Sequence, residues 1–318
     1  MKGTILLKKP KKKRKKWDHR NWTVFIIATI GLLHVIVFHY FPMFGLMLSF
    51  KDGDRSANLL KELLFGKFVG FKHYITFLKD VDFWGVMSNT VLLNLIMLAI
   101  NFPAPILFAL LINEVRHPRF KKIVHSVSTF PHFISWAIYG GIIIALTDQT
   151  TGVFNPILQL FGISSVDNPV YLMGESTIWG VIIISSLIKG IGWGSIIYLA
   201  AISNIDSTLY EAAEIDGATR FQKMFNITLP CIAPTITVFL LLNISRLLGN
   251  SFEQFNSLQN AVNLNRSEVL ATYIYRLSFS ARRYSYGSAI SFFDSLVSLC
   301  LLLLSNTISK RIAGRGLY

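Results

Sequence analysis

Polar side chains inside long apolar stretches are the residues of this sequence that could do chemistry. Lys189 is the sharpest case, because it lies near the middle of an apolar stretch, beside Trp193 and glycines at positions 190, 192 and 194. An ammonium at that depth cannot easily reach water, so it should line a polar cavity or pathway, or pair with a carboxylate. The third interpretation is that the boundaries of the span that contains Lys189 are misplaced. The glycines would allow close packing between helices.

Five further polar residues in apolar stretches each admit two interpretations. Arg246 and Asp294 lie near stretch ends, where they could extend outward to water or lie on the path of a solute. Asn89, Asn94 and Asn243 could hydrogen-bond between helices or face a bound solute.

The sequence carries no motif typical of catalysis. It has no G-x-x-x-x-G-K-[ST] phosphate loop, no H-E-x-x-H helix, no Cys/His metal cluster and no G-x-S-x-G elbow. The two cysteines, Cys231 and Cys300, lie far apart in apolar runs and make a disulfide framework improbable. We therefore expect no catalytic residue, no metal site and no cofactor bound by this chain, which should not hydrolyse ATP itself.

The elements that position these residues must be membrane helices. Of the 318 residues 52% are hydrophobic and only 15% are charged, with a mean hydropathy of +0.49, whereas soluble domains are about a quarter charged. A span needs about 20 apolar residues. The sequence predicts an all-α polytopic membrane protein with six spans, at residues 22–46, 84–112, 123–147, 176–203, 231–250 and 286–309.

The distribution of basic residues predicts the orientation of these spans. Ten of the 31 Lys and Arg residues lie in the first 20 positions, four lie in 113–122 and three in the tail 310–318, whereas 148–175 has none. Because Lys and Arg favour cytoplasmic loops, both termini should be cytoplasmic. Segment 47–83 weakly opposes this scheme, since its six bases are accompanied by five acids.

The basic segment 1–21 has a second possible role. Its run KKPKKKRKK could bind nucleic acid or act as a nuclear signal. It directly precedes the first apolar stretch, however, and this placement favours a cytoplasmic membrane anchor without a nucleic-acid partner.

The loop 204–230 is polar and predicts two short helices. Thr208 with Glu211 and Thr219 with Gln222 have the form of capping boxes, and Gly217 supplies a residue that closes the first helix. Pro230 should stop the second helix from continuing into the next span. Phe221, Met224 and Phe225 fall on one face. A slim first helix, a sharp turn and an apolar second helix would form a rigid projection suited to docking on a partner.

This loop resembles the EAA motif of ABC importer permeases. The match comprises Glu211-Ala212-Ala213, Gly217, and Ile227-x-Leu229-Pro230 at the full spacing. The resemblance implies the type I importer permease fold, with coupling helices that sit in a cleft of a cytoplasmic ATPase subunit. It assigns ATPase coupling to Glu211, Ala212, Ala213, Gly217, Phe221, Ile227, Leu229 and Pro230.

Residues 20–318 resemble the LplB-like permeases of the carbohydrate-uptake class, related to the maltose importer. The segments that carry this resemblance include FHYFPMFGLMLSFKD, FPHFISWAIYGG, GWGSIIYLAAISNIDSTLYEAAEIDGA, SNTISKR and GRGLY. The resemblance implies import of oligosaccharides released from complex polysaccharides, either neutral or uronate-containing. Trp193 could then stack on a sugar ring or simply pack. The substrate-pathway candidates are Lys189, Trp193, Asn89, Asn243, Arg246 and Asp294.

The same resemblance implies a transmembrane permease domain over 22–309 and a set of partners. These are a second, homologous permease, two cytoplasmic ATPase subunits that bind ATP and Mg, an extracytoplasmic sugar-binding protein, and the lipid bilayer of a bacterial cytoplasmic membrane. Segments 47–83 and 251–285 could dock the binding protein or pack on the membrane surface. The alternatives are a secondary transporter or channel that works without an ATPase, and a structural or regulatory membrane protein.

Overall fold

The computed structural model describes residues 19–55, 58–249 and 251–313. These residues fold into helices joined by loops, and their extended structure is limited to one isolated bridge between Lys51 and Phe68. The predicted all-α class is confirmed. Segment 1–21 lies almost wholly outside the described residues, as do the last five residues of the predicted tail.

Five helices are long and apolar enough to cross a membrane, and a sharply bent pair makes a sixth span if it counts as one. The five extend over Trp22–Phe50, Phe83–Asn113, Ile178–Ser203, Arg220–Ser245 and Tyr284–Arg311. Their main elements are α1 (His19–Val35), α5 (Phe83–Asn101), α6 (Pro103–Asn113), α10 (Ile178–Ser203), α13 (Leu229–Ser245) and α17 (Tyr284–Ala313).

The third predicted span is not one straight helix over 123–147. It is the bent pair, in which Pro118–Phe133 and Trp136–Thr147 meet at 104°. The first arm contains α7 (Pro118–Thr129) and a 3-10 turn from Phe130 to Phe133, and the second arm is α8 (Trp136–Thr147). The break follows from local chemistry: Ile134 is extended, and the Ser135 side chain accepts a bond from the Ile138 amide and restarts the helix.

The prediction that Pro230 ends the second loop helix is wrong. A continuous helical segment extends from Arg220 to Ser245, through α12 (Arg220–Lys223), a π-helical turn (Met224–Thr228) and α13. Pro230 lies in the first turn of α13. The π turn changes the backbone hydrogen-bonding pattern just before the proline, and a proline needs no amide partner in a first turn. The helix also ends at Ser245 rather than at residue 250.

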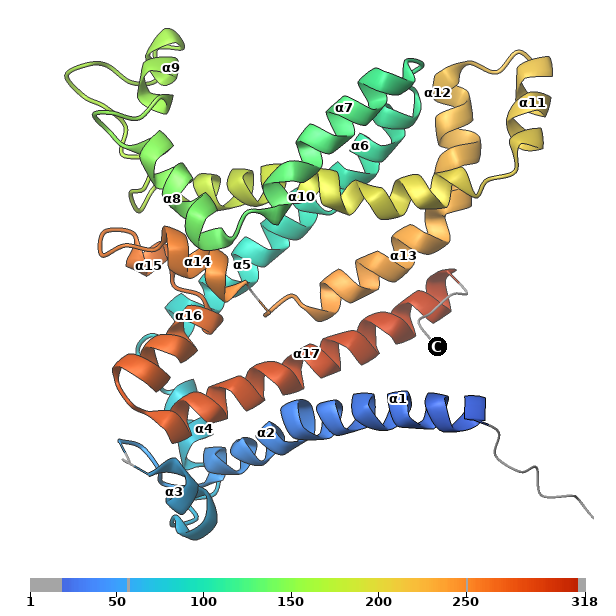
Figure 1. Ribbon diagram of the computed structural model, residues 1–318. Coiled ribbons are helices and arrows are strands. Elements are labelled where there is room, and N and C mark those ends of the chain that lie inside the picture. Colours follow the sequence, from blue (N-terminus) through green and yellow to red (C-terminus); the bar gives the residue numbers. More distant parts are fainter. Residues whose placement is uncertain (1–18, 56–57, 250, 314–318) are drawn as a thin grey trace, which may run out of the picture.

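The short helices gather at the two ends of the molecule (Figure 1). One end carries α3 (Leu59–Phe65), α4 (Lys72–Leu78), α9 (Phe154–Leu160), α14 (Phe252–Leu258), α15 (Leu264–Ser267) and α16 (Leu270–Tyr275). The opposite end carries α11 (Ser207–Ile215) and α12, together with the start of α1, the junction of α6 and α7, and the end of α17.

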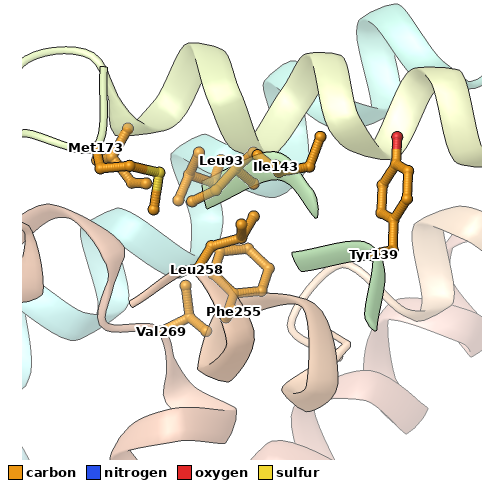
Figure 2. Close-up of a cluster of buried hydrophobic side chains, with 9 residues drawn as sticks. Leu93, Tyr139, Ile143, Met173, Phe255, Leu258 and Val269 are labelled. Carbon is orange, nitrogen blue, oxygen red and sulfur yellow. The ribbon is translucent and has the colours of Figure 1, made fainter. Parts of the chain in front are cut away.

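Three clusters of buried apolar side chains hold the helices together. The central apolar cluster joins α5, α8, α10 and α14, and Figure 2 shows its side chains meeting around Phe255 and Leu258. A second cluster joins α4, α5, α16 and α17, and a third joins α6, α10 and α13. In contrast, the most apolar window of the Trp22–Phe50 segment has no buried residue. Its apolar surface must therefore face lipid or another protein.

Candidate functional site

A cavity of about 530 Å³ lies between α5, α6, α10, α13 and α14. Its volume falls within the range of small-molecule sites. Polar and aromatic side chains share its wall. The polar members are Asn94, Asn101, Ser186, Asn243, Arg246, Ser251 and Gln254, and the aromatic members are Phe102, Trp136, Tyr198, Phe239 and Phe255.

Arg246 is the one Lys, Arg, Asp or Glu side chain among the described residues that line this cavity. It follows α13 directly as the C-cap residue, and its side chain is exposed. None of the ion pairs formed by the described residues includes it. The guanidinium is therefore available to a bound anion, and its planar donors suit a carboxylate.

The amide side chains of the cavity are held in place by backbone carbonyls. Asn94 donates to Thr90, Asn243 donates to Phe239, and Gln254 donates from α14 across to Ile182 of α10 at 3.0 Å. The Oδ1 atom of Asn101 is buried and accepts no hydrogen bond from the described residues. A donor on a bound ligand would satisfy it, because buried polar atoms normally have partners.

Lys189 does not line the cavity but binds the break in the bent pair. Its ammonium donates to the carbonyls of Pro131 (2.9 Å), His132 (3.2 Å) and Ile134, and its side chain is buried. The rings of Trp136 and Tyr139 lie 5.2 and 5.3 Å from the ammonium. Within the described part of the chain it forms no ion pair at contact distance, and its nearest partners are carbonyl dipoles and ring faces.

Trp193, Asn89 and Asp294 also lie outside the residues that line the cavity. Trp193 stacks on His132 with ring centres 4.5 Å apart. Asn89 donates to the backbone carbonyls of Asn265 and Glu268 and so joins two segments of the fold. Asp294 has a buried Oδ1 atom that finds no partner among the described residues.

Of the six predicted pathway residues, the structure therefore brings Asn243 and Arg246 to the cavity. Sequence reasoning missed Asn101 and Gln254. Asn101 could have been found, because it lies seven residues after Asn94 and thus on the same helical face. Gln254 offered no such signal, since it lies in a short helix outside every predicted span.

The loop 204–230 forms the predicted helix–turn–helix, with one correction. Thr208 and Glu211 do not make a capping box, because α11 begins two residues earlier than such a box requires, and its N-cap is Asp206, whose carboxylate accepts from the Thr208 amide. This hydrogen bond lowers the pKa of Asp206. The box of Thr219 and Gln222 is confirmed.

Gly217 closes α11 with φ of +73°, the left-handed conformation predicted for it. The Ala218 amide donates to Ala213 at 2.8 Å and the Gly217 amide to Glu214 at 3.1 Å, which completes a Schellman motif. Lys223 of α12 binds Glu214 at 2.5 Å, an ion pair that lowers the pKa of Glu214. The turn is therefore fixed by backbone and side-chain bonds.

Apolar side chains are exposed on this projection. Ile215 is 88% exposed, Phe221 71% and Phe225 54%, whereas Met224 is buried in the third cluster. Ile215 was not among the predicted coupling residues. Of those, Glu211, Ala212, Gly217 and Pro230 are also exposed, whereas Ala213, Ile227 and Leu229 are partly buried. Exposed apolar groups on a rigid polar loop are typical of a protein-binding surface.

Residues 83–314 match the family described as binding-protein-dependent transport system inner membrane component. The chain belongs to this family. It is 35% identical over 316 residues to the polygalacturonan/rhamnogalacturonan transport system permease protein YteP of Bacillus subtilis (strain 168), covering 99% of this chain and 96% of the relative. Protein LplB of the same organism is 34% identical over 306 residues, covering 96% and 92%.

A solved structure agrees with this assignment. A chain in the crystal structure of a bacterial alginate ABC transporter, in complex with an alginate pentasaccharide-bound periplasmic protein, superposes with a TM-score of 0.83 at 35% identity. The match covers 94% of this chain and 97% of that chain. The predicted importer permease fold and the resemblance to LplB-like permeases are confirmed. These relatives are permease subunits rather than enzymes.

Proposed function

We propose that this family member is the permease subunit of an ATP-driven, binding-protein-dependent importer of oligosaccharides, and that its substrates contain uronate residues. The observation that carries the proposal is the composition of the 530 Å³ cavity, where oriented amides and aromatic rings surround Arg246. Amides satisfy sugar hydroxyls, aromatic faces pack on sugar rings, and a guanidinium binds a carboxylate through paired donors.

The names of the relatives support an acidic substrate. Polygalacturonan, rhamnogalacturonan and alginate, which those names state, are all polysaccharides that contain uronic acids. Because Lys189 is engaged with three backbone carbonyls, Arg246 carries the positive charge available in the cavity. A neutral oligosaccharide would leave this charge without a partner, and binding would forgo the strongest interaction of the site.

The projection formed by α11 and α12 is the proposed contact with the ATPase. It lies at the same end of the molecule as the start of α1 and the end of α17 (Figure 1), so both described ends would be cytoplasmic. This orientation agrees with the basic residues at 113–122 and 310–318. ATP and Mg would bind only to the partner ATPase. Closure of that ATPase would move the projection, and the projection would transmit the movement to the helices around the cavity.

The remaining partners follow from this assignment. A second, homologous permease would supply the other half of the cavity, and an extracytoplasmic sugar-binding protein would dock at the end that carries α9 and α15. Two ATPase subunits complete the assembly, which we place in a bacterial cytoplasmic membrane.

Substrate-stimulated ATP hydrolysis in nanodiscs tests the proposal. The chain is co-expressed with the permease, ATPase and binding protein encoded beside it, and acidic and neutral oligosaccharides are added in turn. We expect stimulation by uronate oligosaccharides that requires the binding protein and is lost when Glu211→Gln is combined with Gly217→Val. An ATPase that does not co-purify would favour a channel or secondary transporter. Equal stimulation by neutral oligosaccharides would refute the acidic substrate.

A further inference from the structure

A second cavity, of about 240 Å³, lies where the end of α8, the loop before α10 and the end of α14 meet. It is smaller than a drug-sized site and has room for about one sugar ring. The elements beside it, α9 and α15, lie at the end of the molecule opposite to α11 and α12 (Figure 1). In the proposed orientation this cavity faces the binding protein.

The central apolar cluster separates the two cavities. Phe255 belongs to this cluster and lines the 530 Å³ cavity, whereas Met173 and Leu258 belong to it and line the second cavity. In Figure 2, Leu258 and Phe255 lie between Met173 on one side and Tyr139 on the other. One layer of apolar side chains therefore divides an outer compartment from the central one.

The helix that carries this layer is held in place. Gly140 of α8 lies so close to Ser257 that an added Cβ would be 2.7 Å from the serine Cβ. Gln254 at the other end of α14 donates to the Ile182 carbonyl of α10. The separation of the cavities is thus a packed feature of the fold.

The polar groups of the second cavity have unused bonding capacity. The Nε2 atom of Gln259 is buried and has no acceptor among the described residues. Asp148 accepts four hydrogen bonds from Thr150 and Thr151 at Oδ1, while its Oδ2 has no donor within the described part of the chain. Tyr171 is 38% exposed at the rim and presents an aromatic ring. An amide donor, a carboxylate acceptor and an aromatic ring together suit a sugar with free hydroxyls.

The charge of this cavity is opposite to that of the central one. The backbone amide of Thr151, the hydroxyl and amide of Thr150 and the hydroxyl of Thr151 donate to Asp148 and hold its pKa well below its usual value. The carboxylate therefore stays ionised near neutral pH. It would accept hydrogen bonds from sugar hydroxyls and repel the carboxylate of a uronate. Arg246 in the central cavity favours the uronate instead.

We propose that the second cavity is an outer subsite that binds one neutral sugar residue of the oligosaccharide through Asp148, Tyr171 and Gln259. This inference rests on the proposed function. An oligosaccharide that carries both neutral and uronate residues would use the two compartments in turn, and one that contains only uronates would use the central cavity alone.

The complete complex in nanodiscs, with its binding protein, tests the subsite. The probes are a tetrasaccharide of alternating galacturonate and rhamnose and a tetrasaccharide of galacturonate alone. We expect Tyr171→Ala and Gln259→Ala each to raise the concentration of the mixed tetrasaccharide that half-maximally stimulates ATP hydrolysis about fivefold, the effect of one lost ring contact and of one lost ligand hydrogen bond, respectively. The response to the galacturonate tetrasaccharide should stay within about twofold. Equal effects on both probes, or no effect on either, would overturn the subsite.

Matched controls come from α9 and the residue that follows it. Phe161 is an aromatic residue, 74% exposed, that lines neither cavity, and Gln159 also lies outside both. Phe161→Ala and Gln159→Ala should leave both probes unaffected. If the unmodified complex responds to no oligosaccharide, the proposed function has failed. If it responds and the subsite variants match these controls, the subsite alone has failed.

A labelling experiment gives a readout independent of ATP hydrolysis. Gln259→Cys is placed in a Cys231→Ser, Cys300→Ser background, because both native cysteines are exposed. A membrane-impermeant thiol reagent should modify it, and the mixed tetrasaccharide should slow that reaction at least about threefold, whereas tetragalacturonate should not. If the labelling rate in the presence of the mixed tetrasaccharide equals the rate in the presence of tetragalacturonate, the proposal is overturned.

Discussion

The ammonium of Lys189 donates a 2.9 Å hydrogen bond to the backbone carbonyl of Pro131, 58 residues earlier in the chain. It also binds the carbonyls of His132 and Ile134, which lie shortly before the Ser135 N-cap of α8. These carbonyls lie at the break of the bent pair, where regular helical bonding stops. A buried cation at this position balances the negative end of the preceding helix. Lys189 thus fixes the path of the third span.

We predict that Lys189→Met destabilises the complex strongly. It leaves buried carbonyl oxygens without a donor, and each such group costs about 1–3 kcal/mol. Thermal unfolding in detergent measures the loss. Lys122→Met is the control, because Lys122 is exposed on the same bent pair. The unfolding midpoint of this variant should be close to that of the unmodified complex. Equal midpoints for the two variants would contradict this role for Lys189.

Gly217→Val should impair ATPase coupling without preventing membrane insertion. Nothing lies within 4 Å of the Cβ that a side chain would add, so the expected penalty comes from the left-handed backbone alone. That penalty is about 1–2 kcal/mol for an ordinary residue and larger for a β-branched one. We expect substrate-stimulated ATP hydrolysis to fall at least about tenfold. Gly217→Asn is the control, since asparagine tolerates this conformation. If Gly217→Asn lost as much stimulated ATP hydrolysis as Gly217→Val, backbone strain would be excluded as the cause.

Ile215→Asp should weaken binding of the ATPase. Ile215 is 88% exposed at the end of α11, where an apolar side chain gains nothing from the fold itself. We expect at least about tenfold weaker association, measured by titrating purified ATPase onto the permease pair in nanodiscs. Ile163→Asp is the control: Ile163 is 63% exposed and follows α9, which lies at the other end of the molecule, so this variant should bind the ATPase normally. Weaker binding by both variants would indicate a general effect of the added charge.

Stability should also depend on Asp80, which joins two distant segments. Its Oδ2 atom accepts hydrogen bonds from Tyr286 (2.7 Å) and Tyr273 (3.1 Å). Burial raises the pKa of Asp80, but bonds from Tyr286, the Asp82 amide and Tyr273, with the charge of Arg283, bring the pKa below its usual 3.8. Because the folded pKa is the lower one, the stabilisation is full above the unfolded value and is lost as pH falls through the folded value.

Asp80→Asn should therefore reduce the free energy of unfolding at neutral pH by roughly 1 kcal/mol, and the unfolding midpoint should fall accordingly. The difference from the unmodified protein should shrink as pH falls below 3.8, the usual pKa, because the carboxylate is then protonated in the unfolded chain and, at lower pH, in the folded protein. Thermal unfolding between about pH 7 and pH 3 checks this. Asp167→Asn is the control, because Asp167 is exposed in the loop between α9 and α10. A constant difference at every pH would contradict the role of the charge.

The apolar pattern was sufficient to predict five of the six spans and the loop between the fourth and fifth, because each depends on local sequence. Ile134 and Ser135 make the break locally, but the bend of 104° is held by Lys189, which reaches carbonyls 55 to 58 residues away, so the local sequence alone does not predict it. For the same reason the sequence predicts Lys189 as a pathway candidate: hydropathy gives the depth of a residue but not the direction of its side chain. Gln254 was missed because a short helix after α13 folds back into the bundle, and only tertiary packing determines that.

Arg246 should decide between acidic and neutral oligosaccharides. It carries the one permanent charge among the described residues lining the 530 Å³ cavity, and no other described residue forms an ion pair with it. Arg246→Gln removes the charge but keeps polar donors, so the half-maximal concentration of a uronate oligosaccharide should rise at least about tenfold. Arg246→Lys keeps the charge without the paired donors and should give an intermediate value. Uptake of a neutral oligosaccharide, where it is measurable, should change less than about twofold in either variant. If Arg246→Gln transports uronate oligosaccharides normally, the charge of the central cavity does not select the substrate, and the acidic substrate we propose loses its physical basis.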